Sequence, residues 1–77
     1  MPEILFLYEG QQIIIEYYNI EDKMEEIIYK FTNMIKEKNN NLCFMYNGYK
    51  INEKLKLNEI IDKNEEKINI LVYNKKK

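Results

Sequence analysis

Five amino-acid types are missing from this chain: histidine, serine, arginine, alanine and tryptophan. The absence of histidine removes the side chain that usually activates a cysteine nucleophile. The absence of arginine leaves lysine as the only basic residue, so the planar guanidinium that specific phosphate and guanine readers favour is missing. Isoleucine, lysine, asparagine, glutamate and tyrosine abound instead, which indicates codon bias from an AT-rich genome. We therefore give the asparagine runs no functional meaning.

Cysteine is nearly absent too, because Cys43 is the only one and no disulfide can form within one chain. This usage is typical of the cytoplasm or nucleus. With no histidine and no oxyanion-stabilising motif beside it, Cys43 is interpreted as an ordinary strand residue. The acidic pairs at residues 25–26 and 65–66 point apart and find no further ligand cluster, so they are interpreted as solvated charges. The sequence therefore predicts a protein that is not an enzyme, with no cofactor and no metal site.

Long apolar runs and a strong net charge are missing as well. The formal net charge is -1, which gives no reason to expect nucleic acid or a membrane surface as a partner. No stretch approaches the ~20 apolar residues that cross a membrane, and the N-terminus lacks the basic-then-apolar layout of a signal peptide. Seven tyrosines could stack on bases, but without arginine or a basic stripe this interpretation is disfavoured.

The length of 77 residues and a hydrophobic content of 45% predict one small folded domain. We assign residues 1–74 to this domain and the three lysines at residues 75–77 to a solvated tail. A chain this short buries a modest core, so we expect a thin stability margin. We also expect a monomer.

The first part of the chain predicts a β-hairpin. The runs ILFLY at residues 4–8 and IIIEYY at residues 13–18 are apolar, β-branched and aromatic, and Gly10 lies in the short link between them. The second run places Ile13, Ile15 and Tyr17 on one face, which we expect to be buried. The parity of the first run is undecided because all five of its residues are apolar.

A helix is predicted next, because the apolar period changes. Asp22 followed by Glu25 has the spacing of a capping box at its start. Lys36 and Lys38 suit the helix dipole near its end, and the three asparagines at residues 39–41 are expected to end it with a left-handed cap. The residues at helical spacing form one apolar stripe: Met24, Ile27, Ile28, Phe31, Met34 and Ile35.

Two further strands are predicted. The run LCFMY at residues 42–46 ends in a tight turn at Asn47 and Gly48. If its Phe44 and Tyr46 face the core, Met45 faces solvent by alternation. The last strand is INILVY at residues 68–73, where the same alternation points Ile68, Ile70 and Val72 inward and Leu71 outward. Between them, residues 57–61 could form one helical turn. The segment at residues 55–67 is too polar and too short for the second full helix of a ferredoxin-like layout.

The order of hairpin, long helix, strand, irregular link and strand is an α+β arrangement. Five segments appear in this order: ILFLYEGQQIIIEYY, DKMEEIIYKF, FMYNGYKI, KLNEI and KINILVY. Together they resemble the ubiquitin-like domains of the ubiquitin superfamily over residues 4–73. The resemblance implies a ubiquitin-like β-grasp fold, with a mixed four- to five-stranded sheet and one long helix packed across it.

The resemblance also implies a binding surface. In that family a hydrophobic patch on the exposed sheet face docks most receptors, and alignment brings Met45 to its central isoleucine, Leu71 to its valine and Asn69 to its histidine. Tyr8 falls near the patch leucine of the first hairpin loop, and Tyr49 falls at a lysine often used for chain building. The residues expected to bind a partner are therefore Tyr8, Met45, Tyr49, Asn69 and Leu71.

The function implied is that of a non-catalytic protein-interaction domain, within a larger protein or as an adaptor. Its expected partner is a protein: a ubiquitin receptor, a proteasome subunit, an AAA ATPase or a ubiquitin-pathway enzyme. An alternative is a covalent modifier, which needs an exposed C-terminal diglycine. This chain reads VYNKKK and its two glycines lie in predicted turns, so the diglycine would have to follow Lys77 in a longer reading frame. We therefore expect the chain as it stands not to be conjugated. A third alternative, a domain that binds a small GTPase, calls for a basic edge strand, which Lys23 and Lys30 do not make.

Overall fold

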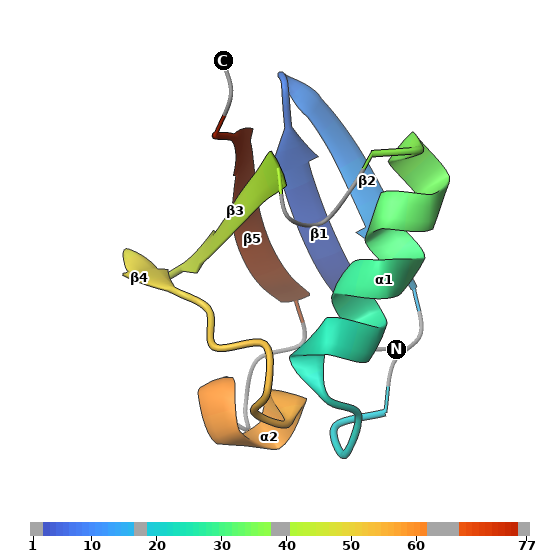
Figure 1. Cartoon of the computed structure of the whole chain (residues 1–77). Helices are drawn as coiled ribbons and strands as arrows, with labels where there is room; N and C mark the ends of the chain where they lie inside the picture. Colours follow the sequence, from blue (N-terminus) through green and yellow to red (C-terminus); the bar gives the residue numbers. More distant parts are fainter. Residues whose placement is uncertain (1–2, 17–18, 38–40, 62–66, 76–77) are drawn as a thin grey trace.

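The computed structural model describes residues 3–16, 19–37, 41–61 and 67–75. They form a mixed five-stranded sheet with one long helix, α1, packed across one face and a short helix, α2, at one end (Figure 1). The α+β class and the mixed sheet are confirmed. The elements are β1 (Glu3–Tyr8), β2 (Gln11–Ile15), α1 (Met24–Ile35), β3 (Leu42–Tyr46), β4 (Tyr49–Lys50), α2 (Leu57–Ile60) and β5 (Lys67–Asn74).

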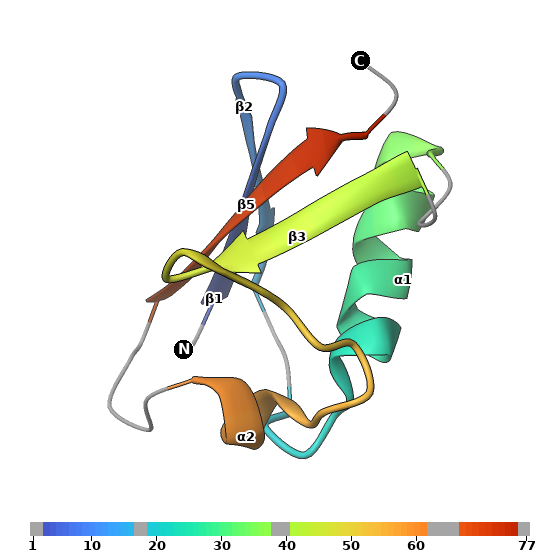
Figure 2. The same cartoon turned by 60° about the vertical axis from the view of Figure 1, so that its left-hand side comes forward.

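The first and last strands lie beside each other within the sheet. The strand order is β2-β1-β5-β3-β4, in which β1 and β5 are parallel and all other neighbours are antiparallel. Figure 2 shows α1 along one side of these strands, so that the other face of the sheet is left open by the helix. We call this second side the outer face.

The structure resolves the parity of β1, which the sequence left undecided. Ile4, Phe6 and Tyr8 join the core beneath α1, whereas Leu5 and Leu7 lie on the outer face. The predicted inward residues of β3 and β5 are confirmed. The core comprises Ile4, Phe6, Tyr8, Met24, Ile27, Ile28, Phe31, Leu42, Phe44, Tyr46, Ile51, Leu57, Ile68, Ile70 and Val72.

All three phenylalanines of the chain meet in this core. The rings of Phe6 and Phe31 stack with centroids 4.3 Å apart, and Phe44 meets them edge-on at 6.3 and 5.8 Å. Tyr8 adds a fourth ring, edge-on to Phe31 at 6.0 Å. Such pairs each contribute roughly 0.5–1.5 kcal/mol beyond the area that they bury. The cluster therefore ties α1 to β1 and β3.

The start of α1 differs from the prediction. The capping box between Asp22 and Glu25 is wrong, because Lys23 is the N-cap residue and no side chain caps the helix. The N–H groups of Met24 and Glu25 instead donate to the backbone carbonyls of Leu55 and Glu53, at 2.9 and 3.0 Å. These donors have no partner within the helix, so a carbonyl from the facing loop satisfies them as well as a side chain would.

Hydrogen bonds also run in the opposite direction, from the start of α2 to the segment before α1. Leu57 N–H donates to the carbonyl of Asp22 at 2.8 Å, and Asn58 N–H donates to that of Ile20 at 2.9 Å. We call this exchange between residues 20–25 and 53–58 the backbone clasp. It joins the starts of the two helices, which lie near each other at the lower end of Figure 2.

The end of α1 also differs. The helix stops at Ile35, and Lys36 adopts the left-handed conformation with φ of 57°. The N–H of Glu37 donates to the carbonyl of Thr32 at 3.2 Å, which closes the helix. The predicted asparagine cap is therefore wrong, and Lys38 lies outside the described residues. Met34 was expected in the buried stripe but is 56% exposed.

The two hairpin turns behave as their sequences predict. Asn47 and Gly48 both have positive φ, 52° and 83°, and join β3 to β4. Glu9 and Gly10 do the same between β1 and β2, with φ of 49° and 78°. Two positive φ values in a two-residue link are typical of the type I′ turn that suits twisted strands.

The second strand differs from its predicted bounds, and the short helix agrees with the prediction. β2 begins and ends earlier than the run at 13–18, and Tyr17 lies outside the described residues. Ile13 and Ile15 are half-buried against the core on the expected side. The predicted helical turn is present as α2. No helix within the described ranges is long and apolar enough to cross a membrane.

The aromatic cluster generates a first prediction. Phe31→Ala should lower the free energy of unfolding by roughly 3–5 kcal/mol, because it leaves a cavity among three other rings. Chemical denaturation measures the change. Tyr29→Ala, on the exposed side of the same helix, is the control and should have a much smaller effect. Equal denaturation midpoints for the two variants would contradict this placement of α1.

The turn at Asn47 and Gly48 generates a second prediction about stability. A Cβ added at Gly48 would meet no atom within 4 Å, so any destabilisation of Gly48→Val comes from its positive φ and not from a clash. We expect the free energy of unfolding to fall by about 1 kcal/mol or more. Lys50→Val, an exposed substitution in β4, is the control and should have a smaller effect. A Gly48→Val variant as stable as this control would argue against the turn.

Candidate functional site

The outer face of the sheet carries an apolar surface that α1 does not cover. A row of three side chains crosses three adjacent strands there, since Leu71 of β5 lies opposite Leu7 of β1 on one side and Met45 of β3 on the other. Directly opposed side chains on neighbouring strands have Cβ atoms about 4.5–5.5 Å apart, so the three make one continuous strip. Leu71 is 50% exposed and Leu7 40%.

Further apolar side chains widen this strip. Leu5 precedes Leu7 on the same face, where it is buried at 9% exposure, and Tyr73 follows Leu71 and is 48% exposed. We call Leu5, Leu7, Met45, Leu71 and Tyr73 the outer patch. They line a shallow hollow of about 340 Å³, which Gln12, Asn47, Gly48, Asn69 and Ile70 complete.

Three of the five residues expected to bind a partner come together here. Met45 and Leu71 are direct cross-strand neighbours, and Asn69 lines the same hollow. Met45 is half-buried, so it is less exposed than alternation alone suggests. The predicted outward direction of Leu71 is confirmed.

The other two lie elsewhere. Tyr8 is only 8% exposed and packs in the core against Phe31, so it is separated from the outer patch by the sheet itself. The hydrogen bond with Glu9 is the largest cause that raises the pKa of Tyr8 above its ordinary value, followed by burial. Tyr49 is 78% exposed on β4 and pairs with Tyr46, whose side chain faces the core side. It lines a different hollow, between β4 and α2, with Ile51, Leu55 and Ile60 among its neighbours.

Three residues of the outer patch were not predicted from the sequence: Leu5, Leu7 and Tyr73. Tyr73 could have been found, because it follows the inward Val72 in an alternating strand. Leu5 and Leu7 could not, since alternation gives no direction in a strand where every residue is apolar. Their direction follows only from which side of β1 packs under α1.

Polar and charged residues surround the outer patch. Lys50 of β4 lies directly opposite Met45, and Lys67 of β5 lies directly opposite Glu3 of β1. Asn69 and Asn47 supply amide groups at the hollow. An apolar centre with a polar rim is the usual composition of a protein-binding surface.

Cys43 lies at the margin of the outer patch, directly opposite Tyr73. The thiol is buried, although it is not part of the core beneath α1. A side-chain hydrogen bond with Cys43 is the largest cause that raises the pKa of Tyr73 above its ordinary value, followed by the electrostatic interaction between the two groups.

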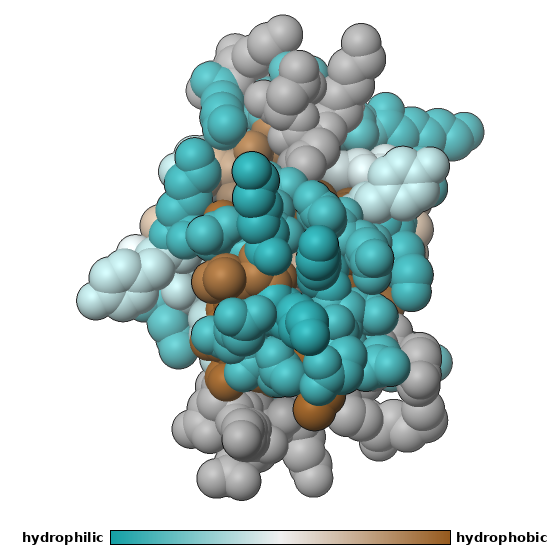
Figure 3. Space-filling model, turned by 60° about the horizontal axis from the view of Figure 1, so that its bottom comes forward, coloured by the Kyte–Doolittle hydropathy of each residue, from teal (hydrophilic) through white to brown (hydrophobic). Residues whose placement is uncertain are grey.

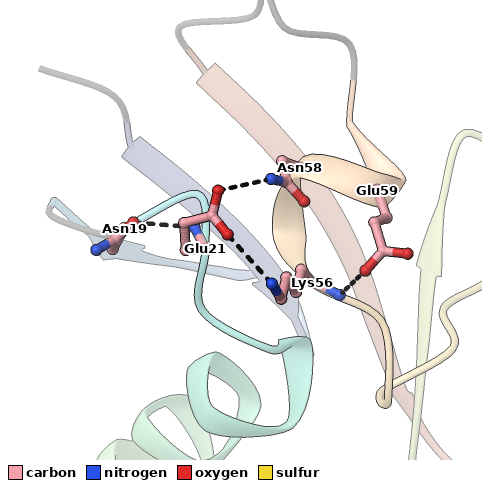
Figure 4. Close-up of polar contacts among 5 residues, drawn as sticks. All are labelled: Asn19, Glu21, Lys56, Asn58 and Glu59. Atoms are coloured by element: carbon pink, nitrogen blue, oxygen red, sulfur yellow. Dashed lines mark hydrogen bonds and ion pairs between the residues drawn. The ribbon is translucent and has the colours of Figure 1, made fainter.

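The end of the molecule that carries α2 has a different character. Figure 3 views this end and shows a mostly hydrophilic surface with small separate hydrophobic spots. Glu21 accepts hydrogen bonds from Lys56 Nζ at 3.3 Å and Asn58 Nδ2 at 3.0 Å, and Glu59 accepts one from the backbone N–H of Lys56 (Figure 4). The Glu21–Lys56 ion pair is largely exposed and is worth about 1 kcal/mol at most. These contacts add side-chain interactions to the backbone clasp.

Metal binding finds no support in the described ranges 3–16, 19–37, 41–61 and 67–75. No group of three or more cysteine, aspartate or glutamate residues there is arranged to hold a metal ion.

Comparison with known proteins gives no family assignment. No protein-family model matches the chain, and no curated protein matches its sequence.

The outer patch generates a prediction about stability. Leu71→Asp should change the free energy of unfolding by about 0.5 kcal/mol or little more, because the new carboxylate remains in water. Ile70→Asp, at the neighbouring position, is the matched control. Its carboxylate would be buried without a partner, so it should unfold the domain. Chemical denaturation of both variants measures the difference, and equal loss of stability would show that Leu71 is packed inside.

Proposed function

We propose that this chain is a ubiquitin-like β-grasp domain without catalytic activity, which binds a protein partner through the outer patch. One observation carries the proposal: the row Leu7–Leu71–Met45 leaves apolar side chains partly exposed across three adjacent strands. The strand order and the helix between β2 and β3 are compatible with a β-grasp.

The physical properties of the outer patch favour recognition of another protein. Contiguous exposed apolar area on a small domain marks an interaction site more often than scattered single residues do. Burying such area contributes about 25 cal/mol per Å², and the strands are already held in the sheet, so little backbone order has to be created on binding. Met45 adds an unbranched, polarizable side chain that adapts to different partner shapes.

The available side chains also argue against catalysis. Cys43 is buried, and the chain contains no histidine to activate it. The partner class that we propose is a ubiquitin receptor, a proteasome subunit, an AAA ATPase or a ubiquitin-pathway enzyme, in the cytoplasm or nucleus. This part of the proposal rests on the resemblance of the sequence segments and on the position of Met45 and Leu71 within the patch.

A titration tests the proposal. The isotope-labelled chain is mixed with purified ubiquitin-receptor domains, proteasomal receptor subunits and AAA ATPase adaptor domains, and its amide signals are followed by NMR. We expect signals of Leu7, Met45 and Leu71 to shift with at least one of them. Leu71→Asp should weaken that binding by tenfold or more, because the complex would bury an unpaired charge.

Tyr29→Asp is the control, because Tyr29 lies on the solvent side of α1, away from the outer face. It should bind as the unmodified chain does. Shifts that cluster around Tyr49 and ignore Leu71→Asp would move the interface to the hollow beside α2. No binding to any protein of the panel would contradict the ubiquitin-pathway assignment.

A further inference from the structure

The two edges of the sheet are built differently. β4 has only two residues, one of them lysine, and a short charged strand is a usual way to keep an edge from pairing with other chains. β2 has five residues, QQIII, with no charge and no proline. Among the described residues only β1 pairs with it. The β2 edge therefore lacks the protection that the β4 edge has.

The hairpin turn determines which backbone groups face that edge. Glu9 and Gly10 form a two-residue turn, so Tyr8 and Gln11 make a hydrogen-bonded pair beside it. In an antiparallel ladder hydrogen-bonded and non-hydrogen-bonded pairs alternate. The N–H and C=O groups of Gln11, Ile13 and Ile15 thus point to β1, and those of Gln12 and Ile14 point outward.

Apolar side chains border this edge on both faces of the sheet. On the helix side, Ile13, Met34 and Ile35 contribute to a hollow of about 370 Å³ beside β2. Met34 is the residue that was expected in the core but is more than half exposed. On the outer face, Ile14 is exposed as well. A strand added at this edge would bury apolar surface on both sides while it satisfied the outward backbone groups.

We propose that the added strand is β2 of a second copy of this chain, paired antiparallel about a two-fold axis at Ile13. This is the register that pairs all five residues of the strand. It places Gln12 opposite Ile14 of the second copy, so the outward N–H and C=O groups of both copies meet, and it brings the two Ile13 side chains together next to Met34. Two-fold pairing of identical surfaces is also the commonest symmetry of homo-oligomers.

The charges at the ends of β2 are compatible with this register. Glu16 follows the strand and comes opposite Gly10 of the second copy, so no two carboxylates are directly opposed. The two sheets continue into each other, and both outer faces lie on the same side. The dimer therefore presents two outer patches on one surface, whereas a monomer was expected from the sequence. The dimer itself does not depend on the proposed function.

Sedimentation equilibrium over a range of chain concentrations tests the proposal. The apparent mass should rise toward twice that of one chain, and exchange of the Gln12 and Ile14 amide protons should slow as it does. Ile14→Pro removes an outward N–H but no bond to β1. Since each dimer then loses two hydrogen bonds, its dissociation constant should rise on the order of tenfold or more. Ile14→Ala keeps the N–H and should have a several-fold smaller effect.

Ile14→Lys provides a second variant, in case proline disturbs the hairpin, and should also weaken the dimer. Leu71→Asp, two strands away, should leave the dimer intact while it removes partner binding, so the two proposals can fail separately. A mass that stays that of one chain at every concentration would overturn the dimer. A dimer that Leu71→Asp breaks and the Ile14 variants do not would place the contact on the outer patch instead.

Discussion

The parallel pairing of β1 with β5 is the constraint on which the other contacts depend. It brings together strands from opposite ends of the chain, and β2 and β3 then attach on either side of the pair. The pairing aligns Leu7 with Leu71 on the outer face and Phe6 with Ile70 in the core. Closing so long a loop costs conformational entropy before any contact is made, so the core must recover it. The ring cluster around Phe31 contributes to that recovery.

The backbone clasp satisfies N–H groups at the starts of both helices. α1 and α2 both begin beside irregular segments, and neither start is closed by a side chain of its own N-cap residue. Exchange of N–H and C=O groups between residues 20–25 and 53–58 satisfies these donors and fixes the two segments to each other. Because the clasp uses backbone atoms, the pattern of side chains does not predict it. Asp22, whose carboxylate was expected to cap α1, contributes its backbone carbonyl to Leu57 instead.

These two features explain which parts of the structure could be predicted from the sequence. Local patterns were sufficient for β3, the turn at Gly48, the inward residues of β5 and the existence of α1, because each depends on neighbouring residues. The helix ends were wrong because a distant loop and Lys36 supply the caps. The candidate site was predicted in part. Alternation placed Met45 and Leu71 on one face, but the outward direction of Leu7 was not predicted. Tyr8 was expected at the binding surface and is buried in the core.

β1 turns Leu7 outward, where it completes an apolar row with Leu71 and Met45. A methyl NOE spectrum of the chain labelled at leucine, isoleucine and methionine tests it directly. The structure predicts cross-peaks from Leu7 to Leu71 and from Leu71 to Met45, and none from Leu7 to Ile27 or Ile28 of α1. Cross-peaks between Leu7 and these helix residues would mean that β1 has the opposite parity, and the row would not exist.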